Sequence, residues 1–534
     1  MGVSSPRRPE SEPDSRWRAV SCGGYRDTGR QVSELLAGDI LAHARRTPDA
    51  SALLWNGTAV TYADLAELGR RAADRIGLSA APRNKPIGLR SRKSPESIAM
   101  VLACLAAGRT VFLPSPDIGH DALDRLSRQA GCPDLVTADD GVADDDERPA
   151  RPGEPASRPA TEPAPPAAAM PPDTSLLLST SGSTGLPKLV PLGGAAVDRF
   201  TAWAGGAFGI GPGTRVLSHA PLNFDLTLLD IWTTLRQGGC VVLVDPERAA
   251  DPHHLARLLH DTRPEVVQAV PLFFRLLTQA PKAPDRVPGV RHVLLTGDHA
   301  PRPLRGTIAR MFPDAVFHNV YGCTETNDSL MYSCTAEEAA ERETLPLGQP
   351  LPGVHMSLRG ADAVLDGPGI GELAVSTPFQ AHGYLGSEAA DEKFFQDGPE
   401  PGARHWFRTG DLVRRAPDGE LTLVGRNDFQ VKAAGVRVNV EEVERVILSH
   451  EQVLDAVVVA VPDTLAGTRL CALVRTRPEA ALSGLKLLAH CSARLARPAV
   501  PTVRLTRDPL PVGPTGKPDR ARVRDAFRTD PALA

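Results

Sequence analysis

The strongest constraint on the fold is a repeating alternation between short apolar runs and longer amphipathic stretches. The run VVLV occupies 241–244, a helical spacing follows through Leu255 and Leu259, and a second apolar run, VVQAV, occupies 266–270. The runs RHVLLT and VFHNVY, at 291–296 and 316–321, continue the pattern. Buried parallel strands joined by crossover helices have this rhythm. The sequence therefore predicts an α/β fold built on a parallel sheet.

The length of the chain and a change of pattern near its C-terminal end predict more than one domain. The chain has 534 residues, more than a single hydrophobic core usually organises. We expect a large multi-layer core over 31–425 and a small α+β domain over 426–534. The small domain is expected to contain a helix, a strand and a second helix near 441–448, 455–461 and 483–496.

Two segments have compositions that rarely form packed structure. Residues 1–30 are polar and rich in Pro, Ser and Arg, and residues 148–172 are dominated by Pro and Ala. Neither segment contains enough apolar surface to offset the entropy lost on ordering. We expect a disordered tail at 1–30 and a surface loop at 148–172.

The composition excludes several classes of protein. No stretch approaches the roughly 18 apolar residues of a membrane-spanning helix, and the N-terminal residues lack the apolar core of a signal peptide. The net charge is -4, and no Lys and Arg run alternates with aromatic residues, which argues against nucleic acid as a partner. The eight cysteines form no CxxC pair, which fits reduced core thiols. We expect a cytoplasmic protein, and nothing in the sequence demands more than a monomer.

The segment STSGSTGLPK at 179–188 is typical of a loop that binds phosphates. Glycines let backbone N–H groups approach an anion, hydroxyls donate further hydrogen bonds, and a lysine adds positive charge. The segment is not a Walker loop, because Leu186 and Pro187 separate its last glycine from the lysine. An ordinary Gly/Ser turn is the alternative. The residues we assign to phosphate binding are Thr180, Ser181, Gly182, Ser183, Thr184, Gly185 and Lys188.

Eight further segments occur in an order that resembles the adenylate-forming superfamily, which includes amino-acid adenylation domains of non-ribosomal peptide synthesis, acyl-CoA synthetases and luciferases. The segments are VTYADL (60–65), LACLAAGRTVFLPSPD (102–117), FDLT (224–227), NVYGCTET (319–326), GELAVSTPFQAHGYL (371–385), FRTGDL (407–412), GRNDFQVKAAGVRVNVEEVE (425–444) and PTGKPDR (514–520). The resemblance implies a large adenylate-forming domain with a small mobile C-terminal domain, and ATP with Mg²⁺ as cofactors.

The resemblance also implies roles for the residues that hold the nucleotide. The ring of Tyr321 would contact adenine, the hydroxyl of Thr324 would contact the α-phosphate, and Glu325 would bind Mg²⁺, which prefers carboxylate oxygen. Asp411 would accept hydrogen bonds from the ribose hydroxyls, assisted by Arg426. The alternatives are a packed core aromatic for Tyr321 and a turn residue after a glycine for Asp411.

Two further residues carry the motion that the resemblance implies. Lys517 matches the adenylation lysine, which would lie between the carboxylate and the α-phosphate in the first half-reaction. Asp428 matches the hinge about which the small domain would turn, removing Lys517 and admitting a thiol. A solvated lysine near a terminus is the alternative for Lys517. The chain departs from the family where Ala433 and Ala434 replace a polar residue after VK, which concerns the thiol-accepting pose.

Asp225 is the residue that favours an amino-acid substrate. In members that activate amino acids, an aspartate at this position pairs with the substrate ammonium, and a buried ammonium without a counter-charge is strongly unfavourable. A helix-capping aspartate is the alternative. Asp328 and Gln268 would meet a hydroxyl or a second amine, or would satisfy each other. By resemblance the pocket comprises Asp225, Leu226, Leu229, Gln268, Leu295, Gly297, Val320, Asp328 and Ser329.

The sequence therefore predicts an enzyme that adenylates an α- or β-amino acid and passes it to a thiol. Because no carrier motif follows Lys517, we expect that thiol to be the phosphopantetheine of a separate carrier protein. The resemblance is to free-standing enzymes, including those that load β-amino acids in natural-product assembly. An acyl- or aryl-CoA ligase that uses free coenzyme A is the main alternative, and a non-catalytic protein that binds nucleotide or carrier is another.

Overall fold

The computed structural model describes residues 33–528 except 79–84, 133–134, 139–140, 143–168, 181–187, 279, 281–284, 361–362, 387–391, 399–402, 427–429, 434, 464–466, 478, 480 and 512–518. Several predictions lie outside the described residues. They are the tail at 1–30, most of the loop at 148–172, the centre of the phosphate loop, Asp428 and Lys517.

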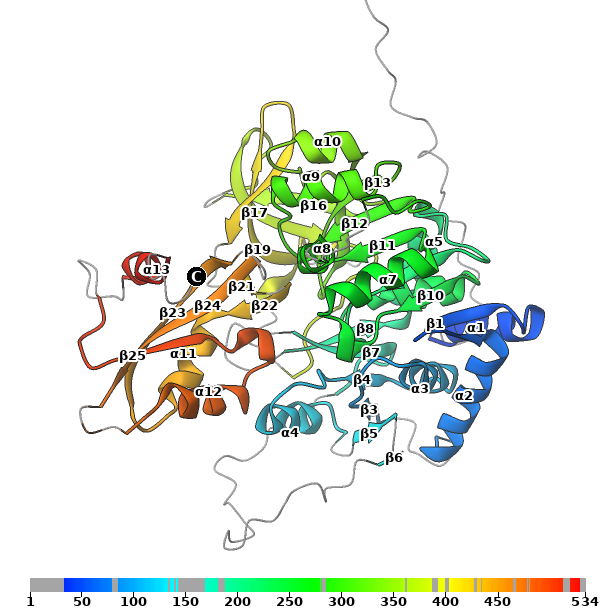
Figure 1. The fold of residues 1–534 in the computed structure, drawn as a ribbon, viewed down its shortest axis with the longest axis horizontal. Helices are drawn as coiled ribbons and strands as arrows, with labels where there is room; N and C mark the ends of the chain where they lie inside the picture. Colours follow the sequence, from blue (N-terminus) through cyan, green and yellow to red (C-terminus); the bar gives the residue numbers. More distant parts are fainter. Residues whose placement is uncertain are drawn as a thin grey trace, which may run out of the picture.

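A nine-stranded sheet lies at the centre of the large domain (Figure 1). Its inner strands, from β13 to β1, are all parallel to their neighbours, and antiparallel strands close both edges. The prediction of an α/β fold with a parallel sheet is confirmed. In order across the sheet, the strands are β15 (Gln349–Pro350), β14 (Asn327–Thr335), β13 (Val316–Cys323), β12 (His292–Thr296), β11 (Val266–Ala269), β9 (Arg215–Ser218), β10 (Cys240–Leu243), β1 (Ser51–Trp55) and β2 (Thr58–Thr61).

A six-stranded sheet forms the second layer of the large domain. Its strands β5, β3, β4 and β7 are parallel, and the antiparallel pair β7 and β8 flanks the predicted phosphate loop. In order across the sheet, the strands are β6 (Gly141–Val142), β5 (Leu135–Thr137), β3 (Ile87–Leu89), β4 (Val111–Leu113), β7 (Thr174–Thr180) and β8 (Lys188–Gly193).

One apolar core joins the two sheets. Strand residues from both sheets belong to it, as does most of helix α3 (Pro95–Ala106), which is buried along nearly its whole length. A helix that is apolar on all sides is stable only inside a protein. Ser94 caps this helix and accepts a hydrogen bond from the amide of Ser97, with Pro95 at the first helical position. The loop before α3 is therefore held rigidly against the core.

The remaining helices of the large domain connect and cover these sheets. They are α1 (Ser33–Arg46), α2 (Tyr62–Arg75), α4 (His120–Gln129), α5 (Gly194–Ala207), α6 (Thr234–Arg236), α7 (Pro252–Thr262), α8 (Pro271–Thr278), α9 (Arg302–Met311) and α10 (Ala336–Glu341), with a π-helix at Leu228–Thr233 and a 3₁₀ turn at Pro246–Arg248.

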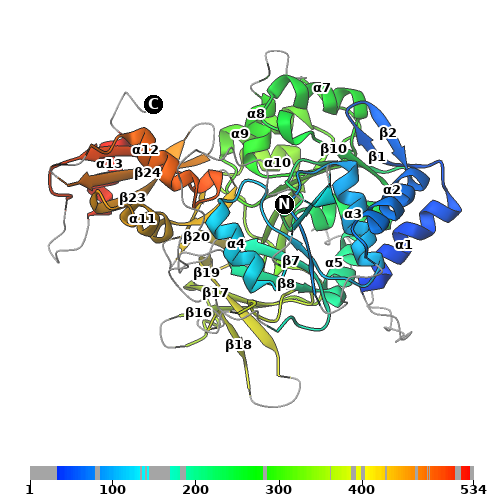
Figure 2. The ribbon, with the colours of Figure 1, turned by 90° about the horizontal axis from the view of Figure 1, so that it is seen from below.

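A third, antiparallel sheet leads from the large domain to the small one (Figure 2). Its strands are β16 (His355–Arg359), β17 (Gly369–Ser376), β19 (His405–Arg415), β18 (Phe394–Gln396) and β20 (Leu421–Arg426).

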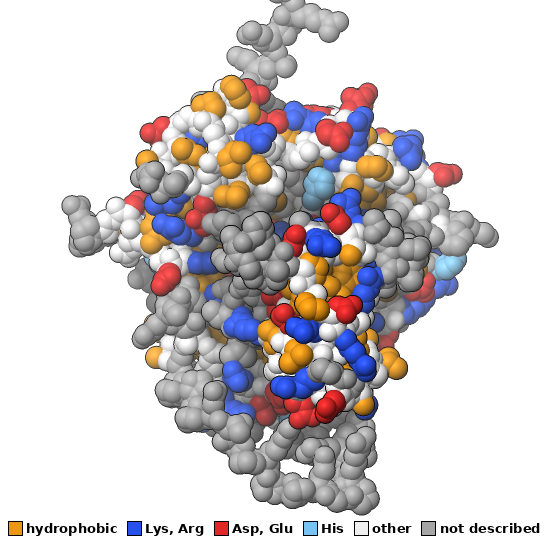
Figure 3. Space-filling model, turned by 90° about the vertical axis from the view of Figure 1, so that its left-hand side faces the viewer, with side chains coloured by type: hydrophobic (Ala, Val, Ile, Leu, Met, Phe, Trp, Pro, Cys, Tyr) orange, Lys and Arg blue, Asp and Glu red, His pale blue; other side chains and the backbone are white. Residues whose placement is uncertain are grey.

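The small domain is an α+β unit with its own apolar core. Basic and acidic side chains are interspersed on the visible, described part of its face (Figure 3). The helix predicted near 483–496 ends at Ser492, because Leu495 and Ala499 turn into the core and Pro498 cannot continue a helix. Its elements are β21 (Gln430–Ala433), β22 (Val436–Asn439), α11 (Val440–Leu448), β23 (Val453–Asp463), β24 (Gly467–Thr476), α12 (Gly484–Ser492), a 3₁₀ turn (Arg497–Ala499), β25 (Thr502–Thr506) and α13 (Arg520–Arg528).

Two predictions from composition can be compared with the described residues. The seven cysteines among them are free thiols, and six of these are buried, as expected for core thiols. No helix in the described ranges is long and apolar enough to cross a bilayer.

Arg305 provides a test of the packing in the large domain. The side chain is 0% exposed, and its guanidinium donates to the carbonyls of Ala339 (2.8 Å), Glu343 (3.2 Å), Ala300 and Arg342, which ties α9 to the end of α10. Arg305→Ala leaves buried carbonyls unsatisfied and should lower the free energy of unfolding by about 3 kcal/mol in urea denaturation.

The matched control is Arg310→Ala, on the exposed side of the same helix. It should change stability by less than roughly 0.5 kcal/mol. Equal stability of the two variants would contradict the assigned role of Arg305.

Candidate functional site

A cavity of about 450 Å³ lies at the carboxyl ends of the parallel strands, between the large and small domains. The residues that follow β9, β11, β12 and β13 contribute to its wall. The chain leaves β9 for β10 on one side and returns to β11 on the other, so the cavity lies where the strand order reverses. Open α/β sheets bind their ligands at this position.

The predicted phosphate loop begins at the cavity wall. Ser179 and Thr180, at the end of β7, line the cavity, and Lys188 opens β8 directly opposite Thr180. Lys188 is buried and does not line the cavity, and its ammonium lies 4.5 Å from the ring centre of Tyr384. A cation above an aromatic face is stabilised by the ring quadrupole. The lysine therefore has a fixed position at one end of the loop.

Glu325 is a buried carboxylate held from both domains. The Tyr384 hydroxyl donates to its Oε1 at 2.6 Å, and Nη1 of Arg437 in the small domain lies 3.9 Å from its Oε2. Burial alone would raise the pKa of Glu325, but the Arg437 guanidinium and the Tyr384 hydrogen bond outweigh it, and the pKa lies below its usual range. An ionised carboxylate at the cavity is a suitable ligand for a hard cation.

Asp411 lies in the middle of β19 and lines the cavity. It is therefore not the turn residue that was the alternative. Tyr321 packs in an apolar cluster rather than along this cavity, and its hydroxyl donates to Oδ2 of Asp411. Arg426 is the strand partner of Asp411, although its side chain lies outside the described set.

Two further carboxylates line the cavity, Asp225 in the loop after β9 and Asp328 at the start of β14. Asp225 precedes the π-helix, whose N-cap is Thr227, so Asp225 does not cap it. Burial raises the pKa of Asp225, and a hydrogen bond from Thr324 opposes the rise. Burial, with a contribution from the charge of Asp225, raises the pKa of Asp328 to about 7. The pair forms an acidic corner of the cavity, beside the aliphatic side chains of Leu226 and Leu229.

The rest of the predicted substrate pocket divides into two groups. Leu226, Leu229, Gln268 and Gly297 line the cavity, together with Asp225 and Asp328. Gln268 donates to the carbonyl of Leu226 at 2.9 Å, so its amide supports the wall and does not satisfy Asp328. Leu295, Val320 and Ser329 are buried away from this cavity.

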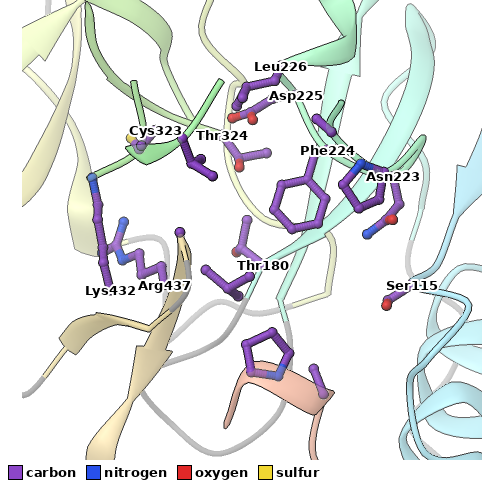
Figure 4. A pocket seen from close by; sticks show the side chains of 18 of the residues that line it. Ser115, Thr180, Asn223, Phe224, Asp225, Leu226, Cys323, Thr324, Lys432 and Arg437 are labelled. Atoms are coloured by element: carbon purple, nitrogen blue, oxygen red, sulfur yellow. The ribbon is translucent and has the colours of Figure 1, made fainter. Parts of the chain in front are cut away.

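The β21–β22 hairpin of the small domain brings residues that the sequence did not single out. Lys432 and Arg437 are cross-strand partners, and both line the cavity beside Cys323 and Thr324 (Figure 4). In the sequence they lie on either side of the glycine turn at Gly435. Two basic residues spaced in this way would be expected to face each other across a hairpin. His219 and the segment 494–499 also line the cavity.

The turn at Gly435 is fitted closely to the large domain. Its φ is +82°, and a Cβ there would lie 2.9 Å from Cγ1 of Val270. A Cβ at Gly297 would meet the same methyl at 2.9 Å. The Cγ1 methyl of Val270 therefore packs closely against both glycines.

The sequence matches the models of one enzyme family and several curated proteins. The AMP-binding enzyme model matches residues 40–385, and the AMP-binding enzyme C-terminal domain model matches 442–517. Phosphinothricin tripeptide synthetase PhsB of Streptomyces viridochromogenes is 30% identical over 97% of this chain and 44% of its own length. D-alanine--D-alanyl carrier protein ligase of Bacillus anthracis is 27% identical over 90% of this chain and 97% of its own length.

The fold also matches solved structures. Holo-PA1221, an NRPS protein with adenylation and PCP domains, superposes with a TM-score of 0.76 at 23% identity, covering 94% of this chain and 87% of that one. The prediction of a large adenylate-forming domain with a smaller C-terminal domain is confirmed. This chain spans less than half the length of the first two curated relatives that it matches.

Gly435→Ala is expected to move the hairpin away from the cavity. The substitution adds a Cβ against Val270 and places alanine at positive φ. Hydrogen exchange of 430–439 should become faster, and Val270→Ala in the same protein should restore part of the protection.

The control is Gly419→Ala, whose φ is +87° but whose Cβ would meet nothing within 4 Å. It carries the same backbone strain without the contact. Equal exchange at 430–439 in the Gly435 and Gly419 variants would show that the close contact does not seat the hairpin.

Proposed function

The chain belongs to the AMP-binding enzyme family, and we propose that it activates an amino acid with ATP as the aminoacyl-AMP and transfers it to the phosphopantetheine thiol of a separate carrier protein. The observation that carries the proposal is the carboxylate of Asp225, which lines a cavity that also holds Thr324 and Glu325. An ammonium paired with Asp225 would place the substrate carboxylate near the groups expected to hold the α-phosphate.

In the first half-reaction an oxygen of the substrate carboxylate bonds to the α-phosphorus, and the bond to the leaving pyrophosphate breaks. Both reactants are anions, so catalysis requires positive charge and hydrogen-bond donors placed in advance. The Thr324 hydroxyl lines the cavity and is suited to that task. Lys188 and the phosphate loop at 181–185 stay predictions for it. Lys517 stays a prediction as the lysine that reaches between the two anions.

The nucleotide site requires hydrogen-bond acceptors for the ribose hydroxyls and a ligand for Mg²⁺. Asp411 would accept from the ribose hydroxyls, with Arg426 beside it, and the hydroxyl of Tyr321 would keep Asp411 oriented. The stacking of adenine on Tyr321 stays a prediction.

Glu325 fits a Mg²⁺ site that is completed by the ligand. No group of three metal-binding side chains occurs within the described ranges. Mg²⁺ commonly binds one or two carboxylates and takes its other ligands from phosphate and water. Bound with ATP, Mg²⁺ would neutralise charge on the leaving pyrophosphate.

The proposed acceptor is a carrier protein because of the named relatives. One relative is a ligase for a D-alanyl carrier protein, and PA1221 contains a PCP domain. In the second half-reaction the carrier thiolate attacks the acyl carbon, and AMP leaves. Rotation of the small domain about Asp428 between the two steps stays a prediction.

The proposed substrate is an amino acid with a modest side chain. Leu226 and Leu229 supply aliphatic surface, and Asp328 supplies a polar corner. A β-amino acid is the narrower proposal, in the context of natural-product assembly. An acyl- or aryl-CoA ligase, for which Asp225 would be structural, is the competing function.

Substrate-dependent ATP–pyrophosphate exchange tests the proposal. We expect exchange with one or more α- or β-amino acids, and a loss on the order of 100-fold or more in Asp225→Asn, because breaking a buried charge pair costs about 3–5 kcal/mol. Asp261→Asn, at an exposed aspartate outside the cavity, is the control and should retain exchange.

Other outcomes separate the alternatives. Exchange only with acids that lack an amine, unaffected by Asp225→Asn, would favour the CoA ligase. Acyl transfer to free coenzyme A but not to a panel of carrier proteins would do the same. Nucleotide binding without exchange across the panel would favour the non-catalytic protein.

The pH dependence of substrate affinity provides a second test. The raised pKa of Asp328, about 7, means that this group is protonated below that value and adds negative charge beside Asp225 above it. The KM for the amino acid should therefore fall as pH rises towards 7, by up to roughly tenfold per pH unit, and then level off.

Asp328→Asn should flatten this dependence, since the amide does not titrate. The KM for ATP, measured in parallel, accounts for protonation of the nucleotide. The same pH profile in both proteins would exclude Asp328 as the titrating group.

A further inference from the structure

We propose that Lys93 positions the substrate loop, defined as residues 219–227 between β9 and the π-helix. The inference rests on the proposed function, because this loop carries Asp225. Lys93 does not line the cavity, so it would act through the backbone that it holds.

Lys93 fixes the start of the substrate loop. It lies in the turn before α3, is 2% exposed, and donates from Nζ to the carbonyls of Ser218 (2.6 Å) and Ala220 (2.8 Å) and to the Ser218 hydroxyl (3.2 Å). An ammonium has three donors, and these contacts use all of them. The two carbonyls flank His219, which lines the cavity. The direction in which the chain leaves β9 is therefore set by a side chain from the turn between β3 and α3.

Asp230 lies just beyond the other end of the loop. It is 0% exposed and lies in the π-helix Leu228–Thr233, three residues after the loop ends. Neither of its oxygens makes a hydrogen bond of normal geometry with a described residue. Burial raises the pKa of Asp230 to about 7, and the Lys93 ammonium opposes the rise. The Asp230 carboxylate therefore interacts electrostatically with the ammonium that holds the start of the loop.

The arrangement is better suited to positioning than to stability. Replacing a buried ion pair with apolar residues is often neutral or stabilising, so burial of charge is weak support for a role in folding. π-Helices are rare and occur frequently at functional sites. An apolar pair fills the same space but cannot hold two carbonyls at fixed positions. Displacement of a binding group by about 1 Å is enough to impair a reaction strongly.

The test is the double variant Lys93→Met/Asp230→Leu, which removes both charges and leaves none unpaired. We expect a melting temperature close to that of the wild type, a KM for the amino acid raised by roughly tenfold or more, and a KM for ATP changed by less than about twofold. The single variant Lys93→Arg keeps the positive charge. Its KM for the amino acid should lie much closer to that of the wild type than the KM of the double variant does.

Tyr62→Phe is the control for stability alone. The Tyr62 hydroxyl is buried within 3.0 Å of the Leu235 carbonyl and 2.8 Å of the Gly239 carbonyl, beyond the substrate loop. Its loss should lower the melting temperature and leave the KM for the amino acid unchanged. A raised KM in this variant would show that destabilisation alone explains the effect.

Hydrogen exchange of 219–227 separates this inference from the proposed function. Exchange should be faster in the double variant than in the wild type, whatever acid the enzyme activates. Unchanged exchange together with an unchanged KM would overturn the positioning role. Faster exchange in a protein that activates no amino acid would retain the role of Lys93 and reject the proposed function.

Discussion

The site depends on the apolar core that joins the two sheets. Helix α3 is buried within it, and the turn before α3 delivers Lys93 to the end of β9. Because the core fixes one sheet against the other, the ends of β7 and β9 meet at one cavity. The chemistry of that cavity then comes from short segments at strand ends, while the strands themselves supply rigidity.

Charge balance is the second constraint on the site. Asp225, Glu325, Asp328 and Asp411 are gathered around one cavity, with Lys432 and Arg437 facing them from the small domain. Carboxylates so close together raise one another's proton affinity unless cations intervene. The contrast between Glu325, whose pKa is lowered, and Asp328, whose pKa is raised, follows the position of Arg437. The proposed metal and ammonium would complete the same balance.

The sequence predicted what local pattern and ordered motifs determine. The parallel strands at 241–244, 266–270 and 291–296 follow from their apolar runs, and Asp225 and Thr324 occupy motifs that meet at strand ends. The sequence did not predict the hairpin at the cavity, because its placement depends on contacts between domains. The hydrogen bonds of Lys93 to Ser218 and Ala220 were equally hidden, since the residues lie in separate segments and nothing local marks Lys93 as buried.

Val270 limits how the pocket could be redesigned. Its Cγ1 methyl occupies the space that a Cβ at Gly297 or at Gly435 would need, so one side chain belongs to both the proposed acid-binding surface and the domain contact. A larger residue at position 270 would have two effects at once: it would reduce the space for the acid, and it would displace the small domain. Directed changes of acid range should therefore begin at Leu229, which lines the cavity without that second contact, and leave position 270 fixed.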